Sequence, residues 1–423
     1  MLYERWHNTV DARRNDLALR DLASDRRWTF AQLFAAGEAR RTDAGGIICP
    51  QGHSPEFIFS LLSAWRSGKI VCPLETGQIL PDVTPPPKDC AHLKWTSGTT
   101  DAARLIAFTA EQLAADAAQI VSAMGLRPDW PNLGVISLAH SYGFSNLVLP
   151  LLLHGIPLIL APAPLPEIIR RAAAQEPAIT LAAVPALWRA WHEAAGIPAQ
   201  VRLAISAGAP LPLNLEQSVF AAGGIKIHNF YGASECGGIA YDAGAAPRTD
   251  ASLAGAPMPG VSLSLNNEGC LVVCGRTVGQ TYWPRQSASL RAGQFQSSDL
   301  AELKNGLVFL RGRAGDQINV AGRKVSPETI ERALLLHPLV RDCLVFGAPG
   351  GDSGRTEMIV AVVASSAGET ELKQFLLGAL PSWQVPRRWR LVESLPTGPR
   401  GKISRAECRA QFTKSFAPTN GTR

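Results

Sequence analysis

The sequence has few cysteines and no uninterrupted apolar segment of membrane-spanning length. Eight cysteines are scattered through 423 residues, and the closest pair, Cys270 and Cys274, has neither zinc-finger spacing nor a second pair beside it. The apolar stretch at 147–165 is interrupted by prolines, Gly155 and His154. These absences argue against a disulfide scaffold, a zinc finger and a protein that spans a membrane.

The first sixteen residues are charged throughout and lack the apolar core of a secretory signal. Together with the scattered cysteines, this favours a reduced, cytoplasmic protein.

The charge is nearly balanced over most of the chain. Lysine and arginine number 41, aspartate and glutamate 35, and the formal net charge is +6. Residues 1–312 hold 25 basic and 25 acidic residues, so the whole surplus, 16 against 10, falls in residues 313–423. This small, local surplus does not predict nucleic-acid binding, but it suits an anionic partner of the C-terminal part.

A composition of 46% hydrophobic and 18% charged residues predicts two or three packed units in a chain of this length. Apolar runs that are each followed by a turn and a helical pattern lie at 134–138, 156–160, 179–184 and 201–206. Strands that alternate with helices predict a mainly parallel sheet covered on both faces.

The pattern changes beyond Gly255. Short strands separated by turn residues, at 261–265, 269–274 and 306–310, predict a small antiparallel barrel or sheet. Farther on lie a helix at 326–336 that Ser326 can cap, strands at 342–346 and 358–363, and a helix at 369–380. We predict an α/β protein. Its N-terminal domain, 1–312, has mainly parallel sheets flanked by helices and a small β-barrel-like part, and its small α+β C-terminal lid domain is 313–423.

Several short motifs carry the chemistry. The string WTSGTT at 95–100 lies between an apolar segment and the helical pattern at 110–124, so we expect a strand-to-helix turn whose donors surround phosphate oxygens. Four other strings follow in order: YGASE at 231–235, SD at 298–299, GR at 312–313 and GK at 401–402.

These strings, in this order, resemble the adenylate-forming superfamily of acyl- and aryl-CoA synthetases, peptide-synthetase adenylation domains and luciferases. The resemblance begins at WTFAQL, 28–33, and extends to Arg405, nearly the whole chain. It implies an ATP- and Mg²⁺-dependent ligase that forms an acyl-adenylate and passes the acyl group to the thiol of CoA or of a phosphopantetheine on an acidic carrier protein.

The resemblance also assigns roles in ATP binding and catalysis. Lys402 would bring positive charge to the carboxylate and the α-phosphate, Glu235 would hold Mg²⁺, and Asp299, assisted by Arg313, would bind the ribose hydroxyls. Tyr231 would stack on the adenine, which Gly208, Ala209 and Pro210 border. Thr100, in the phosphate loop, is the third residue that the resemblance places in catalysis. The remaining nucleotide residues are Thr96, Ser97, Gly98 and Thr99 of the same loop, with Arg104, Gly232, Ala233 and Ser234.

Other positions imply where the acid and the thiol bind. His140, Tyr142 and Phe144 occupy the place of a pocket motif in acyl- and aryl-CoA ligases, and Ala207 and Phe230 flank it. The aspartate that holds an α-ammonium in amino-acid-activating relatives is absent, so a fatty or aryl acid is favoured. Gly322 and Lys324 match the loop that admits pantetheine, and Gly315 stands in the hinge.

Three features depart from the family pattern. Asp101 and Arg104 replace the glycine and lysine that usually follow the phosphate-loop hydroxyls, so the affinity for ATP is in question. Gly315 replaces a charged hinge residue. Only about twenty residues connect Pro73 and Trp95, where relatives have an extra βα unit. This predicts a trimmed sheet edge, or an edge covered by a partner subunit in a homodimer.

Two readings of other classes remain open. AHSYG at 139–143 resembles a nucleophile elbow, and an α/β-hydrolase could combine Ser141 with Asp299 and His337. The second is a catalytically degenerate adenylate-binding protein, because the negative charge of Asp101 would repel the triphosphate and could have cost the protein its turnover.

Overall fold

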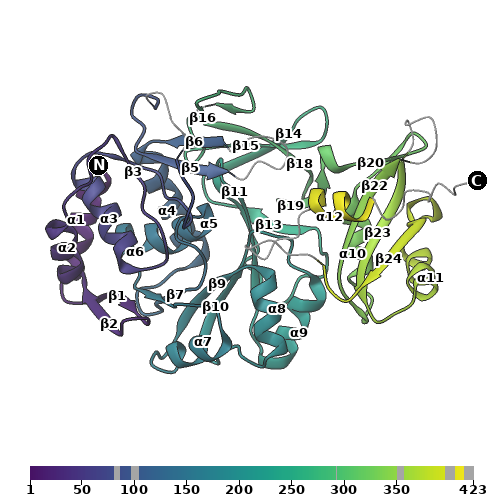
Figure 1. Ribbon diagram of the computed structural model, residues 1–423, viewed down its shortest axis with the longest axis horizontal. Helices are drawn as coiled ribbons and strands as arrows, with labels where there is room; N and C mark the ends of the chain where they lie inside the picture. Colours follow the sequence, from purple (N-terminus) through teal and green to yellow (C-terminus); the bar gives the residue numbers. More distant parts are fainter. Residues whose placement is uncertain (81–85, 97–103, 292, 350–356, 396–404, 414–423) are drawn as a thin grey trace, which may run out of the picture.

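The computed structural model describes the chain except residues 81–85, 97–103, 292, 350–356, 396–404 and 414–423. Figure 1 shows an elongated molecule with the N-terminal helices at one end and the C-terminal strands and helices at the other. Within the described ranges, no helix is both long enough and apolar enough to cross a membrane.

A fourteen-stranded sheet forms the centre of the molecule and has a parallel half and an antiparallel half. The parallel half runs in the order β11, β10, β9, β7, β8, β1. Its strands are β1 (Leu17–Asp21), β7 (Asn132–Gly134), β8 (Leu158–Leu160), β9 (Ile179–Ala183), β10 (Val201–Ser206) and β11 (Ile227–Ala233). The short β2 (Arg26–Thr29) pairs antiparallel with β1 at the edge. The predicted parallel sheet is confirmed.

The antiparallel half continues the same sheet past β11 in the order β12, β13, β19, β18, β15, β14. These strands are β12 (Gly237–Tyr241), β13 (Leu253–Pro257), β14 (Val261–Leu265), β15 (Cys270–Gly275), β18 (Gln294–Lys304) and β19 (Leu307–Arg313), and β17 (Leu290–Arg291) pairs with β18. The sequence predicted a small antiparallel barrel or sheet in this region, and the strands form an antiparallel sheet.

A second sheet of five strands has the order β16, β6, β5, β4, β3. Its strands are β3 (Ile47–Ile48), β4 (Ile70–Val71), β5 (His92–Thr96), β6 (Arg104–Phe108) and β16 (Thr281–Trp283). Strands β3, β4 and β5 are parallel, whereas β6 runs antiparallel to β5. The short connection between Pro73 and Trp95 links β4 to β5, which are neighbours in this sheet, and the two-residue β3 is the edge strand beyond β4. A trimmed edge and a partner subunit at it stay predictions.

Helices cover these sheets (Figure 1). They are α1 (Leu2–Arg13), α2 (Phe30–Ala39), α3 (Pro55–Arg66), α4 (Ala110–Met124), α5 (Ser141–Gly143), the π-helix η1 (Phe144–Val148), α6 (Leu149–His154), α7 (Pro166–Ala173), α8 (Pro185–Glu193) and α9 (Leu213–Gly223). Helix α4 follows the prediction because Thr109 caps its start and Gly125, with φ 65°, ends it.

The C-terminal residues form their own sheets and cores. The strands are β20 (Ile318–Val320), β21 (Arg323–Val325), β22 (Val340–Pro349), β23 (Glu357–Ser365) and β24 (Arg388–Val392), and the helices are η2 (Ala314–Asp316), α10 (Pro327–Leu334), α11 (Glu369–Ala379), η3 (Ser382–Gln384) and α12 (Arg405–Thr413). Their buried residues make clusters separate from the large core. A domain division at residue 312 stays a prediction.

Two local predictions need correction. The strand predicted at 134–138 is β7, which ends at Gly134, because the chain turns so that Gly143 packs against the Ser137 carbonyl. The residues after this turn, Phe144–Val148, form the π-helix η1. Ser326 occupies the N-cap of α10, but its hydroxyl donates to Glu328 Oε2 at 2.6 Å and makes no cap hydrogen bond.

Candidate active site

Tyr231, Asp299 and Arg313 meet where β11 and the β18–β19 hairpin lie in the same sheet. The Tyr231 hydroxyl donates to Asp299 Oδ2 at 2.5 Å, and Arg313 Nε donates to Asp299 Oδ1 at 3.0 Å. Burial, followed by the Asp299 charge, raises the pKa of Tyr231. Burial opposes the charge on Arg313, but Asp299 outweighs it and raises the pKa of Arg313. Two donors, the Tyr231 hydroxyl and Arg313 Nε, therefore hold the Asp299 carboxylate in place.

Glu235 lies in the turn between β11 and β12. The Tyr282 hydroxyl donates to Glu235 Oε1 at 2.9 Å, and the Arg104 guanidinium lies 5.6 Å from the centre of the Tyr282 ring. Burial raises the pKa of the Glu235 carboxyl. Because burial disfavours the negative charge of this carboxylate, a divalent cation bound to Glu235 would stabilise that charge.

The described residues contain no cluster of three histidine, cysteine or carboxylate side chains that could hold a metal ion. Mg²⁺ commonly takes one or two protein carboxylates and completes its shell with phosphate oxygens and water, so its place at Glu235 stays a prediction.

The predicted phosphate loop connects two antiparallel strands. Thr96 ends β5 opposite Arg104, which begins β6, and the Thr96 hydroxyl donates to the Arg104 carbonyl at 3.1 Å. The expected strand-to-helix turn is therefore wrong: the apolar residues 105–108 form β6 before α4 begins. Ser97, Gly98, Thr99, Thr100 and Asp101 lie outside the described residues.

The predicted adenine-binding residues follow the carboxyl end of β10, next to β11. Gly208 has φ 84°, a conformation that favours glycine, and Ala209 and Pro210 continue the segment. Gly232 packs closely on the neighbouring strand, because a Cβ atom there would lie 2.6 Å from the Gly237 carbonyl oxygen. Ala233 ends β11 and Ser234 follows in the turn.

Part of the predicted acid pocket is brought together. The ring centres of Tyr142 and Phe230 are 6.1 Å apart, and the Tyr142 hydroxyl donates to the carbonyl of Ile205, two residues before Ala207. His140 accepts a hydrogen bond from the Tyr142 backbone at 3.3 Å. Phe144, in contrast, is 1% exposed and packs on the ring of His92, with centres 4.4 Å apart. Its place in the pocket stays a prediction.

The predicted hinge and pantetheine residues lie beyond β19. Gly315 is in η2, which links the large sheet to β20. Gly322, with φ 85°, forms the tight turn between β20 and β21, and its N–H donates to Asn319 Oδ1 at 2.9 Å. Lys324 follows on β21 and is exposed.

Lys402 lies outside the described residues. Three positions later, Arg405 begins α12, and its guanidinium bonds Glu331 Oε1 at 2.6 Å and Glu328 Oε1 at 3.2 Å. It also lies 3.5 Å from Asp316 Oδ2 in η2. Arg405 therefore ties the segment after Lys402 to both α10 and the hinge.

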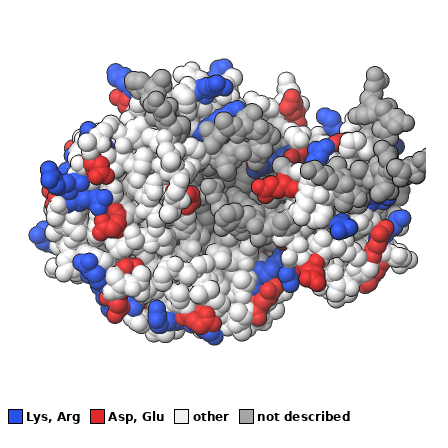
Figure 2. Space-filling model, viewed as in Figure 1, with Lys and Arg blue, Asp and Glu red and all other residues white. Residues whose placement is uncertain are grey.

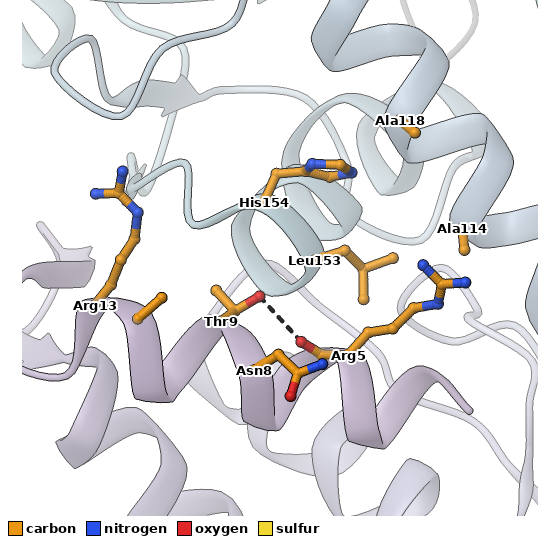
Figure 3. Close-up of a pocket in the computed structure, with 9 residues that line it drawn as sticks. Arg5, Asn8, Thr9, Arg13, Ala114, Ala118, Leu153 and His154 are labelled. Carbon is orange, nitrogen blue, oxygen red and sulfur yellow. Dashed lines mark hydrogen bonds between the residues drawn. The ribbon is translucent and has the colours of Figure 1, made fainter.

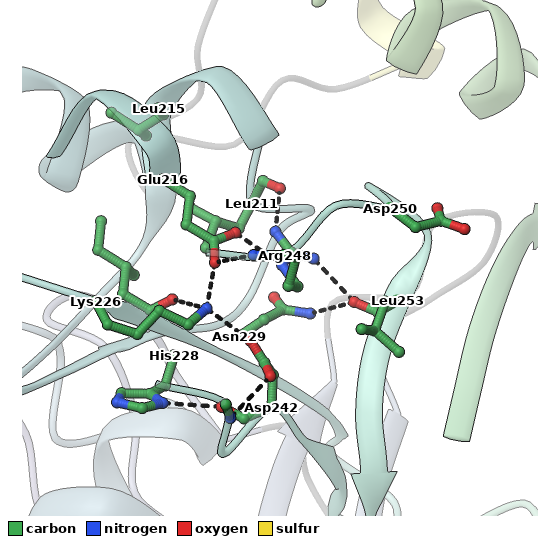
Figure 4. A network of polar contacts seen from close by, with 12 residues as sticks. Leu211, Leu215, Glu216, Lys226, His228, Asn229, Asp242, Arg248, Asp250 and Leu253 are labelled. Carbon is green, nitrogen blue, oxygen red and sulfur yellow. Dashed lines mark hydrogen bonds and ion pairs between the residues drawn. The ribbon is translucent and has the colours of Figure 1, made fainter. Parts of the chain in front are cut away.

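A buried polar network beside the adenine segment was not predicted (Figure 4). Glu216, on α9, is fully buried and accepts hydrogen bonds from Lys226 and from Arg248 Nε. Arg248 Nη2 also donates to the carbonyl of Leu211, which adjoins Pro210, at 2.7 Å. The only feature of the sequence that could have indicated this network is the position of Lys226 directly before an apolar strand.

Replacing Glu216 with leucine is expected to lower the free energy of unfolding by about 3–5 kcal/mol, because a buried arginine and lysine lose a shared counter-charge. Urea denaturation measures this. Asp129, in an exposed ion pair with Arg127, provides the control, and Asp129→Ala should leave the midpoint unchanged. Equal midpoints for both variants would contradict the role of Glu216.

A cavity of about 330 Å³ lies between α1, α4 and α6, and Figure 3 shows Arg5, Arg13 and His154 around it. It contains none of the predicted site residues. On the face shown in Figure 2, basic and acidic side chains of the described residues are interspersed along the rim, with no continuous basic surface.

The α/β-hydrolase hypothesis is not supported, because Asp299 and His337, its acid and its base, have other partners. Asp299 is engaged by Tyr231 and Arg313. His337 lies between α10 and β22, 3.5 Å from Glu371 Oε1, and packs on Phe375. The structure therefore does not assemble a triad around Ser141.

Comparison with known proteins gives two family matches. Residues 75–283 match the family described as AMP-binding enzyme, and residues 329–402 match the AMP-binding enzyme C-terminal domain.

Curated relatives match over part of their length. The chain is 30% identical over 257 residues to the mitochondrial malonate–CoA ligase of Mus musculus, covering 51% of this chain and 43% of that protein. It is 31% identical over 261 residues to a fatty acid–acyl-carrier-protein ligase of Streptomyces coeruleorubidus, covering 55% and 50%. The chain thus spans about half the length of these relatives.

Among solved structures, ATP-bound MatB from Rhodopseudomonas palustris superimposes with a TM-score of 0.86 at 20% identity, over 98% of this chain and 99% of that one. At this identity the likeness establishes the fold.

Proposed function

This chain belongs to the adenylate-forming superfamily of AMP-binding enzymes, and from that premise we propose that it is an ATP-dependent acid–thiol ligase. A carboxylate oxygen attacks the α-phosphate of ATP, and pyrophosphate leaves with the electron pair of the broken P–O bond. A pantetheine thiol then attacks the acyl carbon of the adenylate, loses its proton and releases AMP.

The observation that carries the proposal is the arrangement of Tyr231, Asp299 and Arg313. A partly buried carboxylate fixed by two donors can accept hydrogen bonds from the two ribose hydroxyls. The ring of the tyrosine that fixes this carboxylate would stack on the adenine, since β11 pairs with β10, the strand that precedes the segment 208–210.

The first step brings two anions together, so the site must place cations where charge develops. Mg²⁺ would supply positive charge at the phosphates, with Glu235 holding it, and Lys402 would supply it at the α-phosphate. The remaining residues bind and orient, because in-line phosphoryl displacement asks for little covalent chemistry from the protein.

We propose a fatty or aryl acid as substrate. The side chains brought together beside Ala207 are those of Tyr142 and Phe230, and burial raises the pKa of Tyr142, so its hydroxyl stays neutral. Such a pocket suits an apolar acid and offers no counter-charge for an α-ammonium.

We propose CoA as the acceptor, with a carrier protein as the alternative. The carrier alternative is supported by the Streptomyces coeruleorubidus relative, whose name states that acceptor.

Acid-dependent exchange of labelled pyrophosphate into ATP tests the proposal. We expect exchange with at least one member of a panel of fatty, aryl, dicarboxylic and amino acids, and its loss when EDTA removes Mg²⁺. Mass measurement after adding CoA or a pantetheinylated carrier protein identifies the acceptor. AMP binding without exchange for any acid would overturn the proposal in favour of a degenerate adenylate-binding protein.

A further inference from the structure

A buried ion pair joins β5, the strand that leads into the phosphate loop, to helix α4. Lys94, on β5, precedes Thr96 by two residues, and its Nζ is 3.4 Å from Asp116 Oδ2 on α4. The two side chains are 3% and 2% exposed. The Ser145 hydroxyl joins the pair: it donates to Asp116 Oδ2 at 2.6 Å and accepts from Lys94 Nζ at 3.3 Å.

Asp116 also contacts the turn that carries Glu235. Gly237 follows Glu235 by two residues and has φ 69°. A Cβ atom at Gly237 would lie only 2.2 Å from Asp116 Oδ1. The carboxylate is thus packed directly on the backbone of this turn, and any larger residue at 237 would push the two apart.

Ser145 connects the pair to the predicted acid pocket. It lies in the π-helix η1, immediately after the motif that contains His140 and Tyr142. The same face of β5 reaches this helix a second time, because the ring of His92 packs on Phe144. Isolated π-helical turns often occur at functional sites.

Stability alone does not account for these three side chains. Their surroundings are apolar, with Lys94 Nζ 4.6 Å from the ring centre of Phe108. An apolar pair of similar volume in place of a buried ion pair is often neutral or stabilising, whereas ions fix a specific geometry. The network touches three segments, and each bears a different predicted group: the phosphate loop, Glu235 and the acid pocket.

We propose that Lys94, Asp116 and Ser145 form a positioning frame that sets the phosphate loop, the Glu235 turn and the acid-pocket segment relative to one another. The proposal rests on the proposed function for the identity of these segments. The three residues do not touch the reacting atoms; they act through the backbone of the segments that do. The adenine segment and Asp299 lie outside the frame, so the frame governs the triphosphate and Mg²⁺ and not the nucleoside.

The variant that tests this is Lys94→Met together with Asp116→Leu, which replaces the ion pair by an apolar pair. We expect an unfolding midpoint at least equal to that of the wild type. We expect the dissociation constant of ATP with Mg²⁺ to rise about tenfold and that of AMP to stay unchanged. The exchange kcat should fall by up to roughly 100-fold, the size of effect that a small misplacement produces. Calorimetry and pyrophosphate exchange measure these quantities.

A control removes a partly buried ion pair elsewhere. Arg20, on β1, is 3.8 Å from Glu176 and is 3% exposed. Arg20→Met with Glu176→Leu should leave the binding of ATP and AMP and the exchange rate unchanged. Ser145→Ala removes a single hydroxyl and should weaken ATP binding in the same direction by a smaller factor, so it tests the frame if the double variant does not fold.

Two results would overturn the frame: a variant that binds ATP and AMP as the wild type does, or one in which both affinities fall equally, as general damage would cause. Because these are binding measurements, they judge the frame even if wild-type protein exchanges no acid. That last result would overturn the proposed function alone.

Discussion

Replacing Lys402 with alanine is expected to slow adenylate formation by about 10²- to 10³-fold, the usual loss when one preorganised group that stabilises developing charge is removed. The physical reason is that the carboxylate and the α-phosphate are both anions, and this lysine would supply the cation between them. Formation of thioester from supplied acyl-adenylate should be largely unaffected. Pyrophosphate exchange and single-turnover thioester formation measure the two half-reactions separately.

Lys324 provides the matched control, since it is a lysine of the same C-terminal part and belongs to the predicted pantetheine loop. Lys324→Ala should show the opposite division, with adenylation retained and thioester formation slowed. Equal losses in both half-reactions for Lys402→Ala would refute the role assigned to that lysine.

Replacing Asp299 with alanine is expected to weaken AMP binding roughly 100-fold, because two hydrogen bonds from ribose hydroxyls to a carboxylate are lost. The change also releases Arg313 and the Tyr231 hydroxyl from the partner that fixes them. Calorimetric titration with AMP measures the effect without requiring turnover or knowledge of the acid.

Tyr231→Phe separates the two contributions at this site. It keeps the ring for stacking and removes only the hydroxyl that donates to Asp299, so AMP affinity should fall by about tenfold or less. If Asp299→Ala bound AMP as tightly as the wild type, the ribose would have to bind elsewhere.

The sequence predicted the parts of the site that depend on residue type at a fixed position. Tyr231, Asp299 and Arg313 come from three separate motifs, which the family resemblance assigned to one nucleotide site, and the structure joins their side chains by hydrogen bonds. Their part in binding ATP stays a prediction. The parallel sheet was also predictable, because β10 and α4 have strong apolar patterns and α4 has clear start and stop signals.

Features that depend on packing between distant segments could not be predicted. Nothing in the periodicity of residues 92–96 shows that Lys94 faces Asp116, since a lysine in a strand is ordinarily expected to be exposed. The phosphate loop was placed before a helix because β6 is only five residues long and its apolar run resembles the start of α4. Ser326 kept the expected N-cap position, but Glu328 engages its hydroxyl.

Strand β11 joins the two halves of the large sheet: it pairs in parallel with β10 at residues 227–229 and antiparallel with β12 from Phe230 onward. Asp299 and Arg313 reach Tyr231 only through strands made much later in synthesis. A nascent chain released only as far as β12 would have its parallel strands but would lack Asp299, the proposed partner of the ribose hydroxyls. With the ribose role proposed for Asp299, we expect nucleotide to stabilise the large sheet fully only once residue 313 has emerged from the ribosome.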